Sequence, residues 1–140
     1  MTMTVKEWLN RNYKLSKELE TKQACLETII NITSKTSVDY YSGRQENSNE
    51  IKFLRWSELK EEVERLIVEV NAVDRQTDAV LRQLEDSDEY RVLYCRYVSR
   101  MEWRDIKTCF GYSKSSMFRA HNDGLNHISE IVKGNFELYF

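Results

Sequence analysis

The longest regular pattern in the chain is a stripe of apolar residues within residues 51–84, at alternating steps of four and three. The stripe consists of Leu59, Val63, Leu66, Val70, Val73, Thr77, Val80 and Leu84. This spacing places the side chains along one seam of an α-helix, as in a coiled coil. At a rise of 1.5 Å per residue the helix would be about 50 Å long, so we expect a partner helix to cover the seam.

A second stripe with the same spacing lies in residues 4–32. It consists of Trp8, Asn12, Leu15, Leu19, Lys22, Leu26 and Ile29. The intervening residues 33–50 are rich in Ser, Thr and Asn and contain Gly43, which predicts a loop, with Tyr40 and Tyr41 as aromatic anchors. Three interpretations are open: the stripes pair within one chain as an antiparallel hairpin, or two copies pair along them in a homodimer, or both pairings occur.

A third zone, residues 85–133, predicts shorter helices. Ser87 precedes a helix that should run to Val98, with Leu93, Tyr94 and Tyr97 facing inward. The end of the last helix is expected at Gly134, followed by an apolar tail over residues 134–140.

Two helices separated by a tight turn are predicted between these limits. Trp103, Ile106 and Phe110 recur at i, i+3 and i+7, on one face of a short helix. Gly111 tolerates the positive φ needed where that helix ends, and Ser113 is a suitable N-cap for the next helix. This arrangement predicts a helix-turn-helix.

The second helix of this motif, residues 113–129, would be the recognition helix. Met117, Ala120 and Leu125 should face inward. The residues expected to contact DNA are Ser113, Lys114, Ser115, Ser116, Phe118, Arg119 and Asn122. In the major groove Arg pairs with guanine, Asn pairs with adenine, and an apolar group contacts the thymine methyl.

Arginines before the turn are candidate contacts to the phosphate backbone. They are Arg91, Arg96, Arg100 and Arg104, of which Arg100 and Arg104 are the principal candidates. An alternative to DNA binding is open, in which these helices form only a structural three-helix core. For Phe118 the alternative is that its ring packs against Tyr112 or the C-terminal tail instead of contacting DNA.

Charge is distributed unevenly along the chain. The net charge is −2, yet the segment from Arg91 to Asn122 holds seven basic and two acidic residues. Because salt screens charges beyond about 8–10 Å, a basic module in an acidic chain can still bind phosphate. Acidic residues elsewhere should weaken non-specific DNA binding.

Composition narrows the class of protein. The 140 residues contain no proline, which favours long uninterrupted helices. The spacing of Cys95, Cys109, His121 and His127 matches no common zinc site, and we expect no metal, cofactor, disulfide or catalytic set. The sequence contains no apolar stretch long enough to span a membrane, and its first residues lack the apolar core of a signal peptide. We therefore expect a cytoplasmic protein.

The segment from Tyr90 to Leu125 resembles the helix-turn-helix of sigma-factor region 4. It is more similar to small bacteriophage late-gene activators of the ArpU and RinA type, on a set of short motifs. The motifs are Tyr94–Tyr97, Trp103-Arg104-Asp105-Ile106, Gly111-Tyr112-Ser113, Arg119-Ala120-His121 and Gly124-Leu125. Tyr41-Ser42-Gly43 corresponds to a Tyr-x-Gly element of the family, and Glu102 and Lys107 depart from its pattern.

The resemblance implies activation of phage late genes by promoter binding in the bacterial host, with RNA polymerase as a further partner. The sequence predicts an all-α protein with a helical hairpin or coiled coil in residues 1–84 and a helix-turn-helix domain in residues 85–133. We expect a dimer on duplex DNA, with half-sites about one or two helical turns apart. Alternatives are a small terminase subunit, which would assemble into rings, and a coiled-coil adaptor without DNA binding.

Overall fold

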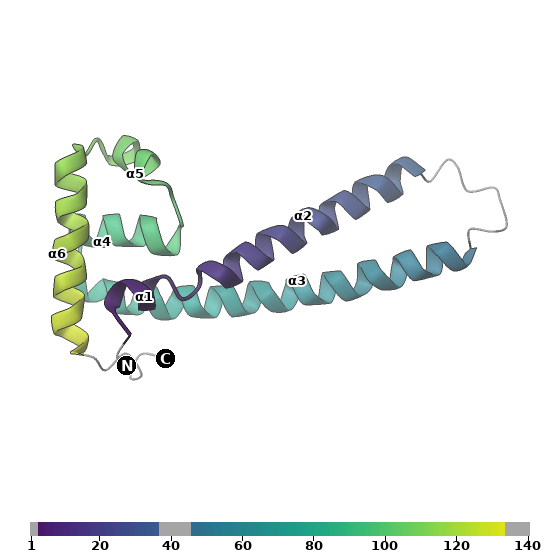
Figure 1. Ribbon diagram of the computed structural model, residues 1–140, viewed down its shortest axis with the longest axis horizontal. Helices are drawn as coiled ribbons and strands as arrows, with labels where there is room; N and C mark the ends of the chain where they lie inside the picture. The colour runs from purple at the N-terminus through teal and green to yellow at the C-terminus, as the bar shows by residue number, and fades with distance from the viewer. Residues whose placement is uncertain (1–2, 37–45, 134–140) are drawn as a thin grey trace. The chain divides into compact units, whose positions relative to one another are not determined.

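The computed structural model describes residues 3–36 and 46–133, with side chains for residues 3–31 and 50–133. Its elements are α1 (Val5–Leu9), α2 (Tyr13–Thr36), α3 (Glu46–Leu81), a 3₁₀ turn (Arg82–Leu84), α4 (Asp88–Leu93), a π turn (Tyr94–Val98), α5 (Trp103–Phe110) and α6 (Lys114–Val132) (Figure 1). All regular structure in the described residues is helical, which confirms the all-α prediction. The predicted anchors Tyr40 and Tyr41, the Tyr41-Ser42-Gly43 element and the tail lie outside these residues.

The described residues form two compact units, one around α6 and one made of α2 with most of α3. The first, here called the α6 unit, contains residues 3–12 and 72–133; the second, the hairpin unit, contains residues 13–36 and 46–71. The expected boundary after residue 84 therefore differs from the structure. The reason is packing: the N-terminal residues and the end of α3 share a core with α4 and α6.

A break at residues 10–12 separates α1 from α2, so the N-terminal stripe is not one continuous seam. Trp8, which the spacing assigned to that seam, is instead fully buried in the α6 unit. Asn12 is also buried there, where its Nδ2 donates to Asp74 Oδ1 at 2.8 Å. The Arg11 guanidinium lies 3.9 Å from the Trp8 ring centroid and donates to Thr77 Oγ1 at 3.0 Å.

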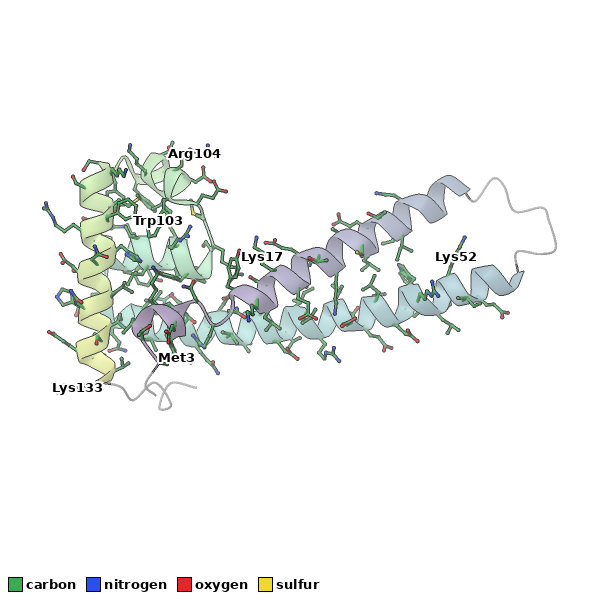
Figure 2. All side chains as sticks on the ribbon, in the orientation of Figure 1. Met3, Lys17, Lys52, Trp103, Arg104 and Lys133 are labelled. Carbon is green, nitrogen blue, oxygen red and sulfur yellow. The ribbon has the colours of Figure 1, made fainter. Side chains whose placement is uncertain are left out.

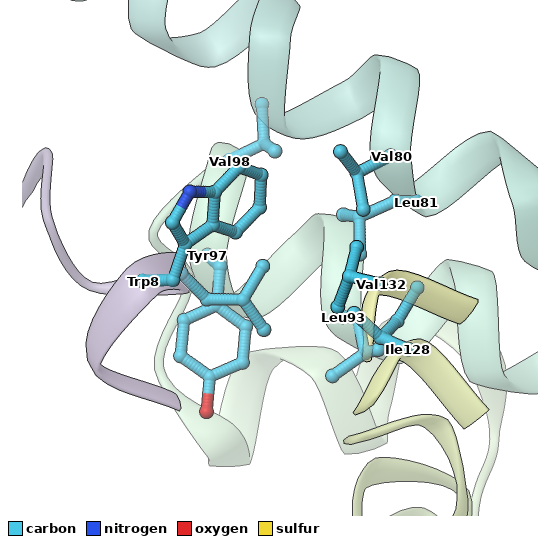
Figure 3. Close-up of a cluster of buried hydrophobic side chains, with 9 residues drawn as sticks. Trp8, Val80, Leu81, Leu93, Tyr97, Val98, Ile128 and Val132 are labelled. Carbon is cyan, nitrogen blue, oxygen red and sulfur yellow. The ribbon is translucent and has the colours of Figure 1, made fainter. Parts of the chain in front are cut away.

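The main core of the α6 unit joins four helices and the π turn (Figure 3). Its buried residues are Trp8, Leu9, Val80, Leu81, Leu93, Tyr97, Val98, Ile128 and Val132. A smaller cluster of Val92, Cys95, Ile106 and Met117 lies between α4, α5 and α6. Because apolar burial is worth about 25 cal/mol per Å², these two clusters are the main source of stability of the unit.

The helix predicted to reach Val98 does end there, but its last five residues, Tyr94–Val98, form a π turn. Ser99 N–H donates to Tyr94 O at 3.0 Å, and Met101 N–H donates to Cys95 O at 2.9 Å. Arg100 then adopts a positive φ of 56°, which redirects the chain into α5. Of the three residues expected to face inward, Leu93 and Tyr97 are buried and Tyr94 is only half-buried.

In the hairpin unit α2 and α3 run antiparallel and diverge toward the loop (Figure 1). Val63, Leu66 and Val70 of the predicted seam are buried. Lys22, one of the polar interruptions, pairs with Glu62 across the two helices and with Glu18 at 2.7 Å. These hydrogen bonds raise the pKa of Lys22. The α2–α3 pairing therefore accommodates a lysine in the seam.

Candidate nucleic-acid interface

The turn between α5 and α6 has the geometry that its sequence predicts. Gly111 follows α5 in the left-handed conformation, with φ 67° and ψ 28°. Tyr112 N–H then donates to Lys107 O at 3.1 Å, which satisfies one of the last carbonyls of α5. A residue with a Cβ would be strained at this φ, so glycine suits the turn.

Ser113 caps α6 as predicted. Its Oγ accepts the Ser116 N–H at 3.1 Å, and Ser116 Oγ donates back to Ser113 O at 3.0 Å. The two hydroxyls also lie 2.8 Å apart, so both serine side chains are engaged in the cap. Lys114 and Ser115 are exposed beside them at the positive end of the helix dipole.

One face of α6 is buried and the other is accessible. The buried residues are Met117, His121, Gly124, Ile128 and Val132. Ala120 and Leu125, also expected to face inward, are half-buried. Arg119 and Asn122 are exposed, as predicted for residues that would contact bases.

Phe118 does not lie on the exposed face, although the sequence placed it among the residues expected to contact DNA. Its ring is half-buried and tilted against Trp103, with the ring centroids 4.9 Å apart. The indole of Trp103 also contacts His121, with the two rings at 88° and their centroids 4.9 Å apart. The Arg96 guanidinium lies 4.6 Å from the centroid of the Trp103 ring. Phe118 therefore holds α5 against α6 and is removed from the predicted base contacts.

Phe110 also differs from the prediction. It was expected on the inward face of α5 with Trp103 and Ile106, yet it is 40% exposed. Ile106 is fully buried, whereas Phe110 lies one turn later, at the end of the helix, and packs against Tyr112 with ring centroids 5.6 Å apart. Ile106 is thus the one residue of the short α5 that is fully buried.

Three of the four candidate arginines are already engaged by protein groups. Arg100 forms a two-point ion pair with Asp74, at 3.0 and 3.2 Å. Arg91 pairs with Asp86 at 2.9 Å and with Asp88 at 3.1 Å, whereas Arg96 donates to Met101 O at 3.0 Å. Arg100 is therefore a poor phosphate contact, because binding would require it to leave a half-buried carboxylate.

Arg104 remains accessible at the start of α5, with 82% of its side chain exposed and Glu102 at 3.5 Å (Figure 2). Lys107, three residues later on α5, is also exposed. Together with Lys114 and Arg119 these side chains give α5 and the start of α6 four exposed cations against two exposed anions, Asp105 and the N-cap residue Glu102. The local charge therefore favours an anionic ligand.

Sequence reasoning missed the part played by His121. Its Nε2 lies 2.6 Å from Tyr97 Oη, and its Nδ1 lies 3.2 Å from Asn122 Oδ1. With neutral imidazole, Nδ1–H donates to Asn122 while Nε2 accepts from Tyr97. Burial lowers the pKa of His121, and Lys6 and Arg96 add to this effect. Its spacing from Met117 and Gly124 was the available signal, since it continues the buried face of α6.

Comparisons with known proteins add no assignment, because no family model, curated protein or solved structure matches the chain. Within the described residues no three His, Cys, Asp or Glu side chains are grouped so that they could hold a metal ion. None of the helices described is both long enough and apolar enough to cross a membrane.

Proposed function

We propose that this protein is a sequence-specific DNA-binding transcriptional regulator, with α6 lying in the major groove of duplex DNA. The observation that carries the proposal is the α5–Gly111–α6 arrangement, which leaves the first turns of α6 exposed and basic. The width of the major groove admits an α-helix, and its base edges differ for all four base pairs.

Each exposed residue has a role in this proposal. Arg119 pairs with guanine and Asn122 with adenine, because their side chains match the donors and acceptors of those bases. Lys114, Ser115 and the N-terminus of α6 bind phosphate, as does Arg104. The Ser113 and Ser116 hydroxyls contribute chiefly by capping the helix.

The resemblance to phage late-gene activators extends the proposal to the cellular process. It assigns the protein to the cytoplasm of a bacterial host, where it would activate late promoters and contact RNA polymerase. A homodimer would place two copies of α6 on half-sites about one or two helical turns apart.

Selection from a random pool of duplexes, followed by fluorescence anisotropy across a salt series, tests the DNA-binding proposal. We expect the selected duplex to bind more tightly than random duplex, with affinity falling steeply as salt rises because phosphate contacts release counterions. Arg75→Ala is the matched control for Arg119→Ala. It removes the same positive charge from an exposed position, but on α3 instead of α6. Absence of binding at low salt would overturn the proposal.

A further inference from the structure

In the hairpin unit, α3 carries more apolar surface than α2 covers. Val63, Leu66 and Val70 are buried, whereas Phe53, nearer the start of α3, is 64% exposed. Trp56 and Ile67 are only half-buried. Figure 2 shows Lys52 on this same part of α3, where α2 has diverged from it. Apolar surface of this kind, left uncovered by α2, is typical of a protein–protein contact.

The uncovered residues follow one side of α3 in steps of three and four. We call them the flank strip: Phe53, Trp56, Lys60, Glu64 and Ile67. Phe53 stacks on Trp56 with ring centroids 5.9 Å apart, and Lys60 Nζ lies 5.1 Å from the Trp56 ring centroid. The strip is therefore an ordered surface of aromatic rings with one cation and one anion beside them.

Charge along α3 indicates which partner fits this strip. Within the strip the one cation, Lys60, and the one anion, Glu64, are both exposed and lie one helical turn apart. Two copies packed antiparallel, with the two-fold axis midway between these residues, bring Lys60 of each copy against Glu64 of the other. Parallel packing would place like charges together, which is unfavourable.

We propose that a second copy of this chain packs antiparallel against the flank strip, which forms a four-helix bundle from two hairpins. A two-fold axis midway between Lys60 and Glu64 sets Lys60 of each copy opposite Glu64 of the other. The same axis brings Trp56 and Phe53 of one copy within about one helical turn of Ile67 of the second copy. The contact specifies where the homodimer in the proposed function forms, but it does not require DNA.

The opposite face of α3 does not fit this role. Leu54 and Val68 are exposed there, at 58% and 65%, but Glu61 lies midway between them in the same heptad register. Glu58 flanks this face with further negative charge, and Arg65 there lies 3.8 Å from Glu62 and 4.0 Å from Glu69. Two copies that met there would bring carboxylates together, so Leu54 serves as a control position.

Sedimentation equilibrium over a range of protein concentrations, without DNA, tests the contact. We expect the full chain to form dimers and Phe53→Ser to raise the dimer dissociation constant about tenfold or more, because two buried rings are lost per dimer. Leu54→Ser should leave the constant within about twofold of wild type. Far-ultraviolet circular dichroism confirms that both variants stay helical.

A charge exchange tests the antiparallel register. Lys60→Glu and Glu64→Lys should each weaken the dimer several-fold, because each creates a like-charge pair across the two-fold axis. The double variant K60E/E64K should restore wild-type association. A wild-type monomer at all concentrations, equal effects at Phe53 and Leu54, or no rescue by the double variant would each overturn the proposal. A failure of DNA binding would leave these masses unchanged.

Discussion

At the scale of single residues, the accessible face of α6 is supported by a side chain that lies beneath it. His121 lies beneath this face and contacts both Tyr97 and Asn122. One side chain therefore belongs to the core and also orients a candidate base contact. Arg119, three residues before Asn122, is exposed and has no such constraint.

Replacing Arg119 separates base recognition from phosphate binding. We predict that Arg119→Ala lowers discrimination at one base pair by about 1–3 kcal/mol, because a two-point contact to guanine is lost. Arg104→Ala should weaken all duplexes equally and make the salt dependence shallower. Anisotropy with the selected duplex and its single-base variants measures both effects. Uniform weakening by Arg119→Ala would instead make Arg119 a phosphate contact.

The lowered pKa of His121 predicts loss of stability in acid. In the unfolded chain a histidine takes up a proton near pH 6.5, whereas buried His121 resists protonation, because its pKa lies below that value. The free energy of unfolding should therefore fall as the pH drops from about 6.5 toward the folded pKa. Thermal melts between about pH 5 and 8 measure this dependence.

His127 provides the control with opposite sign. Its hydrogen bond to Glu89 at 2.7 Å raises its pKa, so its contribution is present at low pH and is lost as the pH rises through the folded pKa. His127→Gln should therefore steepen the acid loss, whereas His121→Gln should remove the part due to His121. An unchanged slope in His121→Gln would show that another group is responsible.

At the scale of elements, local chemistry predicted helix ends well and packing partners poorly. Gly111 and Ser113 mark the turn because φ and N-capping depend on neighbouring backbone atoms alone. Trp8 has coiled-coil spacing, yet it lies in the core of the α6 unit, since periodicity shows that a face is apolar but not what covers it. For the same reason the sequence did not predict that the Phe118 ring packs against Trp103.

The contact between α4 and α6 depends on a glycine whose role is steric. A Cβ at Gly124 would lie 2.8 Å from Leu93 Cδ1 and 3.3 Å from Glu89 Cβ. We predict that Gly124→Val lowers the free energy of unfolding by about 1–3 kcal/mol through overpacking. Asn126→Val, at an exposed position of the same helix, is the control in urea denaturation. Equal losses in the two variants would contradict the close approach.

At the scale of the whole molecule, charge and apolar surface are divided between its two units. The basic, exposed residues of α5 and α6 belong to the α6 unit, and the flank strip belongs to the hairpin unit. The overall balance of −2 conceals this division, and the local count reveals it. The ion pair between Arg100 and Asp74 could not be predicted from the sequence, because the two residues are 26 positions apart.

Methylation interference on the selected duplex tests the central claim, that α6 reads the major groove. Methylation of guanine N7 alters the major-groove edge that arginine contacts. The proposed function predicts that methylated guanines at particular positions block wild-type binding, and that Arg119→Ala is insensitive at one of them. Interference at no guanine, or equally at all, would contradict recognition by α6 in the major groove.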